Sequence, residues 1–238
     1  MKSLLLDWKK NLVGFLLLTC AFGAPLYGMQ IAQDGHGTDR DYETSEKLAR
    51  SIYKSAHKEF KKKKYWDAAL DLIFILDFYP HFTALDRAVL LLGDSMYEMG
   101  IYRGADKMYR YILKSIPKTD LLPQAILGLQ KVHYQLGHYQ KSLKFYTALE
   151  SHFPRDKVMD ESHYYAGETF YHMKNYSMVE STMQLVGKKS EFYPFALYTS
   201  ALTDLKKKES GRRSPSSYRF PGPRQKMRRD GSWSMIPV

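Results

Sequence analysis

The chain contains a single cysteine, Cys20, among its 238 residues. One thiol cannot form an internal disulfide, and it cannot supply the several cysteine ligands of a zinc or iron–sulfur site. Common enzyme motifs are missing as well: there is no glycine-rich phosphate loop, no GxSxG, no HExxH and no CxxC. We therefore expect a protein that is not an enzyme and that uses no cofactor and no metal.

The sequence also lacks an apolar run long enough to cross a membrane. The run from Leu12 to Ala24 has 13 residues, follows Lys9 and Lys10, and ends at Pro25. A membrane span needs about 20 apolar residues, whereas a short run behind basic residues is typical of a secretory signal peptide. We expect residues 1–28 to be a cleaved signal peptide, with an uncleaved N-terminal anchor as the alternative.

A third possibility depends on Cys20. Leu17-Leu18-Thr19-Cys20 loosely resembles the lipobox of bacterial lipoproteins, in which the cysteine carries the lipid. A lipobox normally has Gly, Ala or Ser where this chain has Thr19, so we favour a cysteine that is simply part of the signal core. An anchor or a lipidated Cys20 would be the only contact with a membrane. The expected location is the periplasm or the outer-membrane periphery, or else the inner membrane with the chain facing the periplasm.

The body of the chain repeats with a period of 37 residues. One tyrosine column consists of Tyr65, Tyr102, Tyr139 and Tyr176. A proline column consists of Pro80, Pro117 and Pro154, and an aromatic column of Phe60, Tyr97, Tyr134 and Tyr171. A period of 20–50 residues with helical patterning is typical of a solenoid of stacked helix pairs.

The second repeat indicates how one unit folds. We expect Asp86 to cap a first helix, and Gly100 to form the turn that follows it. A second helix is then expected from Tyr102 to Ser115, ended by Pro117.

A glycine in the middle of the first helix predicts close packing of the pair. Gly93 costs about 1 kcal/mol against alanine at such a position, and a close approach of the partner helix would compensate. Ala56 and Gly167 stand at the matching positions of other repeats. Gln130 breaks this column, so we expect looser packing in the third repeat.

These residues resemble the tetratricopeptide repeat. The resemblance is carried by Leu92, Gly93, Tyr97, Gly100, Tyr102, Ala105, Tyr109 and Pro117, and in part by the same columns of the other repeats. It covers residues 45–208 and implies an all-α, right-handed α-solenoid of about four and a half helix pairs that binds other proteins. The 37-residue form is similar to the repeats of exported bacterial proteins, namely the lipoprotein of the outer-membrane β-barrel assembly machinery and the periplasmic repeat protein of the Tol–Pal system.

The first helices of stacked pairs line a concave groove in such solenoids. A stripe about 100° away from Gly93 on the helix gives the candidate groove residues. They are Tyr53, His57, Arg87, Leu90, Asp94, Leu127, Lys131, Tyr164, Glu168 and His172. The apolar members would form a floor for a peptide or helix with apolar anchors; alternatively, they pack between neighbouring units. Glu168 and His172 share a helix face, but with no third ligand nearby we interpret them as a solvated pair rather than a metal site.

The two ends of the chain carry most of its positive charge. Residues 206–238 hold ten Lys or Arg against two acids, and residues 1–23 hold three Lys against one acid, whereas residues 24–205 are nearly neutral. We expect residues 29–44 to be a linker and residues 209–238, rich in Pro, Gly and Ser, to be a disordered basic tail. The neutral array favours a scaffold that binds a protein of the bacterial cell envelope, not nucleic acid. The alternative is a membrane-surface or nucleic-acid-binding protein that acts through the tail.

Overall fold

The computed structural model describes residues 39–212, 225–227 and 233–235. The fold of residues 39–212 is all-α, as predicted. The helices are α2 (Asp39–Lys61), α3 (Tyr65–Phe78), α4 (Leu85–Glu98), α5 (Tyr102–Ser115), α6 (Leu122–Gln135), α7 (Tyr139–His152), α8 (Met159–His172), α9 (Tyr176–Met183) and α10 (Tyr193–Arg212). Two short strands, β1 (Gln225–Met227) and β2 (Trp233–Met235), pair antiparallel. The signal peptide, anchor and lipobox expected within residues 1–28 lie outside the described residues.

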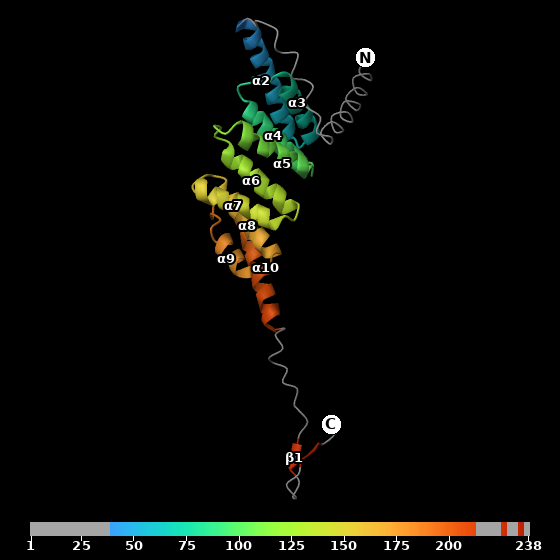
Figure 1. Cartoon of the computed structure of the whole chain (residues 1–238), viewed down its shortest axis with the longest axis vertical. Helices are drawn as coiled ribbons and strands as arrows, with labels where there is room; N and C mark the ends of the chain where they lie inside the picture. Colours follow the sequence, from blue (N-terminus) through green and yellow to red (C-terminus); the bar gives the residue numbers. More distant parts are fainter. Residues whose placement is uncertain (1–38, 213–224, 228–232, 236–238) are drawn as a thin grey trace, which may run out of the picture. The chain divides into compact units, whose positions relative to one another are not determined.

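The described residues belong to two compact units that divide inside α4, between Ser95 and Met96. In the first unit, α2 packs against α3. In the second unit, each helix from α5 to α10 packs against the next one in sequence, and α8 also packs against both α6 and α10 (Figure 1). Packing between alternate as well as successive helices is what a stack of helix pairs produces. The predicted α-solenoid of helix pairs is therefore confirmed.

The turn inside each helix pair uses one backbone conformation. Gly100 and Gly137 have φ angles of 74° and 69°, and Lys63 and Lys174 have 60° and 59°. These four positions are 37 residues apart, so the period of the sequence is also a period of the backbone. Glycine adopts positive φ without steric cost, which explains Gly100 in the predicted turn. Asp86 is not the expected N-cap, because α4 already begins at Leu85 and the Asp86 carboxylate accepts from the backbone N–H of Arg87 at 2.7 Å.

The two aromatic columns meet in every pair. The ring centroids lie 5.2 Å apart for Phe60 and Tyr65, and 5.5 Å apart for Tyr97 and Tyr102. The corresponding distances in the next two pairs are 6.3 Å (Tyr134 and Tyr139) and 6.1 Å (Tyr171 and Tyr176). Aromatic pairs at this separation add to the stability that their burial provides. The columns therefore hold the two helices of each pair together at their turn.

The second helices end in the same way in three pairs. Tyr79, Ile116 and Phe153 each follow the last helical residue and have φ between −130° and −134°. Each of them stands directly before a residue of the proline column. A proline disfavours the helical conformation of the residue before it, so the chain must leave the helix at this point.

The close approach predicted from the glycine column is confirmed at Gly167. A Cβ atom at this position would lie 2.6 Å from Cε of Met183 on α9. The expectation of looser packing at Gln130 is wrong. Gln130 is fully buried, and its side-chain amide donates to the Ser162 carbonyl at 2.8 Å while its Oε1 accepts from the Ser162 hydroxyl at 2.6 Å. Hydrogen bonds to α8 thus satisfy the polar group that replaced the small residue.

Several element boundaries differ from those expected. α2 begins at Asp39, inside the expected linker of residues 29–44, and α10 continues past residue 208 to Arg212. β1 and β2 lie within residues 209–238, which were expected to be disordered. The sequence between the strands contains Asp230-Gly231, a dipeptide that is typical of hairpins and could have signalled this pairing.

Candidate protein-binding surface

The candidate groove residues lie on first helices of the pairs. Tyr53 and His57 are on α2, and Arg87, Leu90 and Asp94 are on α4. Leu127 and Lys131 are on α6, whereas Tyr164, Glu168 and His172 are on α8. The first five belong to the first compact unit and the last five to the second. Each set is therefore described within its own unit.

Lys131 is the centre of a polar cluster that joins α6 to α8. Its Nζ lies 2.6 Å from Oε1 of Glu161, and both side chains are only 22% exposed. The same ammonium lies 5.0 Å from the ring centroid of Tyr97 and 5.6 Å from that of Tyr165. A cation over two aromatic faces and against a carboxylate has a fixed position. These contacts thus hold the ammonium of Lys131 in place.

Tyr134 organises the second half of the same surface. Its hydroxyl donates to Oε2 of Glu168 at 3.3 Å and lies 3.2 Å from Nε2 of His172. The imidazole of His172 stacks on Tyr139, with 5.4 Å between the ring centroids. Glu168 also accepts from Thr199 of α10 at 2.5 Å. Burial, followed by the charge of Glu168, raises the pKa of Tyr134, so its hydroxyl remains a donor.

These two clusters are joined by Tyr134 and Tyr165, whose ring centroids lie 5.4 Å apart. Together they form one surface across α6 and α8, with Tyr97 at the end of α4, which we call the polar surface. Its members are Tyr97, Lys131, Tyr134, Glu161, Tyr165, Glu168 and His172. The sequence had identified Lys131, Glu168 and His172 as neighbours on a binding face. It had assigned Tyr97 and Tyr134 to the aromatic columns alone, and had overlooked Tyr165. Each of these three tyrosines stands three or four residues from a charged residue on the same helix, and side chains at this spacing meet. This spacing could have indicated that they belong to the polar surface.

Leu127 does not form an exposed floor. Its side chain is 6% exposed and belongs to a core cluster with Tyr146, Leu149 and Met159. For this residue the alternative, packing between neighbouring units, is the one that the structure supports. Tyr164 is half-buried, with its ring 5.5 Å from Phe192 and 6.1 Å from Phe195.

In the first unit, Tyr53 is half-buried between two other rings. Its centroid lies 6.3 Å from that of His57 and 6.2 Å from that of Phe82. Burial raises the pKa of the Tyr53 hydroxyl. Leu90 and Asp94 of α4 are half-buried as well, whereas Arg87 is exposed. This unit therefore presents the same mixture of aromatic and charged groups as the second.

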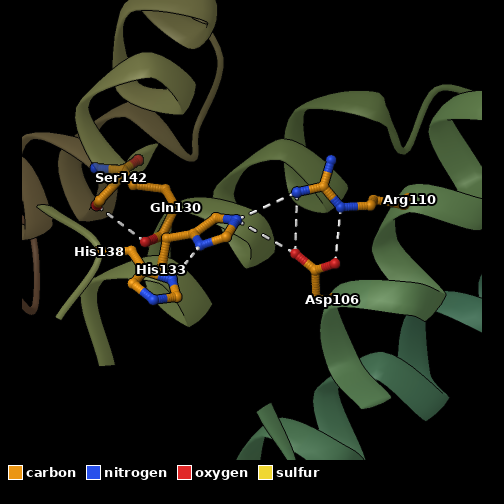
Figure 2. Close-up of polar contacts among 6 residues, drawn as sticks. All are labelled: Asp106, Arg110, Gln130, His133, His138 and Ser142. Atoms are coloured by element: carbon orange, nitrogen blue, oxygen red, sulfur yellow. Dashed lines mark hydrogen bonds and ion pairs between the residues drawn. The ribbon is translucent and has the colours of Figure 1, made fainter. Parts of the chain in front are cut away.

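A second polar cluster lies at the contact between α5 and α6, around His133 (Figure 2). Nε2 of His133 is 3.3 Å from Oδ1 of Asp106 and 3.2 Å from Nη2 of Arg110. Its Nδ1 lies 3.4 Å from Nδ1 of His138, and its ring stacks on Phe145 at 5.4 Å. The side chain of His133 is almost fully buried, and burial lowers its pKa below the ordinary value of about 6.5.

The buried imidazole of His133 predicts that acid destabilises the second unit. The folded state binds the second imidazole proton of His133 less tightly than the unfolded state does. The free energy of unfolding is therefore at its full value above a pH of about 6.5 and decreases below it. We expect Tm to fall between pH 7.5 and pH 5.5, and to fall less in His133→Gln, which cannot titrate. Burial also lowers the pKa of His163. Because His163 is present in both proteins, its contribution cancels when the two decreases in Tm are compared. Equal decreases in Tm would show that His133 is not responsible.

The described residues contain no group of three or more side chains that could hold a metal ion. Glu168 and His172 meet through the hydroxyl of Tyr134 instead. No helix within residues 39–212 is both long and apolar enough to cross a membrane. No protein-family model matches the chain, and no curated protein was found to match it.

Proposed function

We propose that the chain is a non-catalytic scaffold that binds a segment of a protein partner along the polar surface of α6 and α8. The observation that carries this proposal is the continuity of that surface across two first helices of a solenoid. Charged and aromatic side chains held in place by one another lose little conformational freedom on binding. Tyrosines with one polar end are also enriched at protein interfaces.

The proposed setting is the envelope of a bacterium. It is supported by the short apolar run behind two lysines at residues 9–24 and by the resemblance of the repeats to exported tetratricopeptide proteins. In this setting the partner would be a periplasmic or outer-membrane protein.

Reversing the charge of Lys131 tests the proposal. We expect the wild type to capture a discrete protein from envelope extract, and Lys131→Glu to capture it at least about tenfold less, a loss of about 1.4 kcal/mol. The pair Lys131→Glu with Glu161→Lys restores the ion pair with opposite polarity. It also places a carboxylate against the rings of Tyr97 and Tyr165, so its circular dichroism is compared with that of the wild type, and the folded protein should still fail to bind. Quantitative mass spectrometry of the captured proteins provides the measurement.

Two controls separate this surface from the tail. Lys144→Glu changes an exposed lysine of α7 and should leave capture unchanged. Removal of residues 213–238 should also leave it unchanged. If capture survives Lys131→Glu, or if removal of the tail abolishes binding to anionic vesicles or RNA and no protein is captured, the scaffold proposal is wrong.

A further inference from the structure

Glu168, in the polar surface, carries a charge that no cation of the described chain balances. Its Oε1 accepts from the hydroxyl of Thr199 on α10 at 2.5 Å, and its Oε2 accepts from the hydroxyl of Tyr134 on α6 at 3.3 Å. Both donors are neutral. Within residues 39–212, no lysine, arginine or histidine forms an ion pair with this carboxylate. The side chain is half-buried, so its charge is screened less than that of an exposed residue.

The preceding repeat shows how a charge at the same position is balanced. Lys131 stands 37 residues before Glu168 in the sequence. It contacts the next first helix, α8, as Glu168 contacts α10, but it meets the carboxylate of Glu161 at 2.6 Å and two aromatic rings. In the next layer a neutral hydroxyl, that of Thr199, takes the place of the opposite charge. The charge of Lys131 is therefore balanced within the chain, whereas that of Glu168 is not.

Aromatic groups lie beside the Glu168 carboxylate. Tyr164 and His172 stand four residues before and four residues after it, so the three side chains follow one side of α8. Tyr134 contacts both Glu168 and His172 from α6. Burial, followed by the charge of Glu168, raises the pKa of Tyr164 to about 12, and the same charge contributes to the raised pKa of Tyr134. Both phenols stay neutral, so the carboxylate is a negative charge beside two tyrosine rings.

We propose that the partner segment carries an arginine whose guanidinium contacts the carboxylate of Glu168 beside the rings of Tyr134 and Tyr164. This contact rests on the proposed function, since it concerns the same surface and names the chemistry of its partner. A carboxylate offers about four acceptor positions, and two of them are used here, so lone pairs remain for a guanidinium. An arginine is also weakly hydrated and stacks on aromatic faces, which favours it over lysine at this site.

The charges around this site favour a basic side chain over an acidic or neutral one. An acidic segment would meet a like charge at Glu168, and a neutral segment would cover the carboxylate without pairing it, which costs free energy. The lysines at the end of α10 do not balance the charge. Lys206 stands seven residues after Thr199, about 10 Å further along the helix, and Lys207 pairs with Glu180 at 2.6 Å.

Selection from a random peptide library tests the proposal. The full chain is immobilised, and phage that display random peptides of about 12 residues are selected on it. We expect arginine to be at least about threefold more frequent in the bound peptides than in the library. On Glu168→Gln its frequency should return to that of the library. Glu150→Gln, at an exposed carboxylate of α7, is the matched control and should keep the enrichment.

The affinity of one selected peptide separates recognition from folding. Replacing its arginine by citrulline, a neutral analogue of similar shape, should weaken binding to the wild type at least about tenfold. On Glu168→Gln the two peptides should bind within about twofold of each other, because the carboxylate that distinguishes them is absent. A variant that had only lost structure would bind both peptides less tightly and keep their ratio.

Two negative results have different meanings. Selected peptides without an excess of arginine, or an excess that survives Glu168→Gln, would overturn the arginine contact and leave the scaffold proposal standing. A wild type that selects no peptide at all would contradict the scaffold proposal itself, and the arginine contact with it.

Discussion

Gly128→Ala should destabilise the second unit by about 2–3 kcal/mol, although alanine is the better helix former by about 1 kcal/mol. A Cβ atom at Gly128 would lie 2.5 to 2.7 Å from Cζ, Cε2 and Cε1 of Tyr109. Tyr109 is 2% exposed, and because protein interiors are close-packed, its ring can move away only by displacing its neighbours. We expect Tm to fall by about 5–10 °C, measured by thermal unfolding followed by circular dichroism.

Two variants test the cause of this decrease. Gly167→Ala also creates a short contact, but with the flexible end of Met183, so its effect should be smaller. Tyr109→Leu introduces the residue that the first repeat carries at the same position, Leu72. When it is combined with Gly128→Ala, the double variant should lose less free energy of unfolding than the two single variants lose in sum. Strict additivity would show that the ring of Tyr109 is not what alanine meets.

Leu127→Asp should unfold much of the second unit, with a loss of more than about 4 kcal/mol. The substitution places a carboxylate among Tyr146, Leu149 and Met159, where the present side chain is 6% exposed. An unpaired charge in such a place costs far more than the lost apolar contact. Helical circular dichroism should decrease, and Leu127→Met, which conserves volume, should cost less than about 1.5 kcal/mol.

This experiment also distinguishes the two interpretations of the apolar stripe on the first helices. If Leu127 formed the floor of an open groove, aspartate would reduce partner binding and leave the helical content unchanged. The buried position of Leu127 predicts instead that Leu127→Asp loses helical structure by itself, in the absence of any partner. A folded Leu127→Asp protein would therefore contradict the structure at this position.

The sequence predicted the helices well because its period and its turn residues agree. The expected helix from Tyr102 to Ser115 is α5, residue for residue, since Gly100 and Pro117 limit it from both sides. The same reasoning is less reliable at α9. This helix ends at Met183, although Val186, which stands 37 residues after Leu149, is still buried. No proline follows it at the repeat spacing, and Gly187 interrupts the helical pattern instead.

The candidate surface was predicted less well, because a helical stripe defines a direction and not an exposure. Lys131 and Glu168 do lie on one surface, as their spacing indicated. Leu127 shares their helix face in projection, but α7 and α8 cover it in three dimensions. The partners that hold the charged groups, Tyr134 and Tyr165, come from columns that suggested only core packing. A tyrosine has an apolar ring and a polar hydroxyl, so it can pack in the core and also take part in the polar surface.

The hydrogen bonds between repeats have a consequence for the order in which the chain can fold. Gln130 and Ser162 are 32 positions apart, Tyr134 and Glu168 are 34 apart, and Tyr134 and His172 are 38 apart. Each of these bonds therefore closes a loop of about one repeat. In a repeat array whose contacts reach only the neighbouring repeat, folding can start at one repeat and extend to the next. Each layer of the second unit can accordingly form once a single further repeat has left the ribosome, without waiting for the rest of the chain.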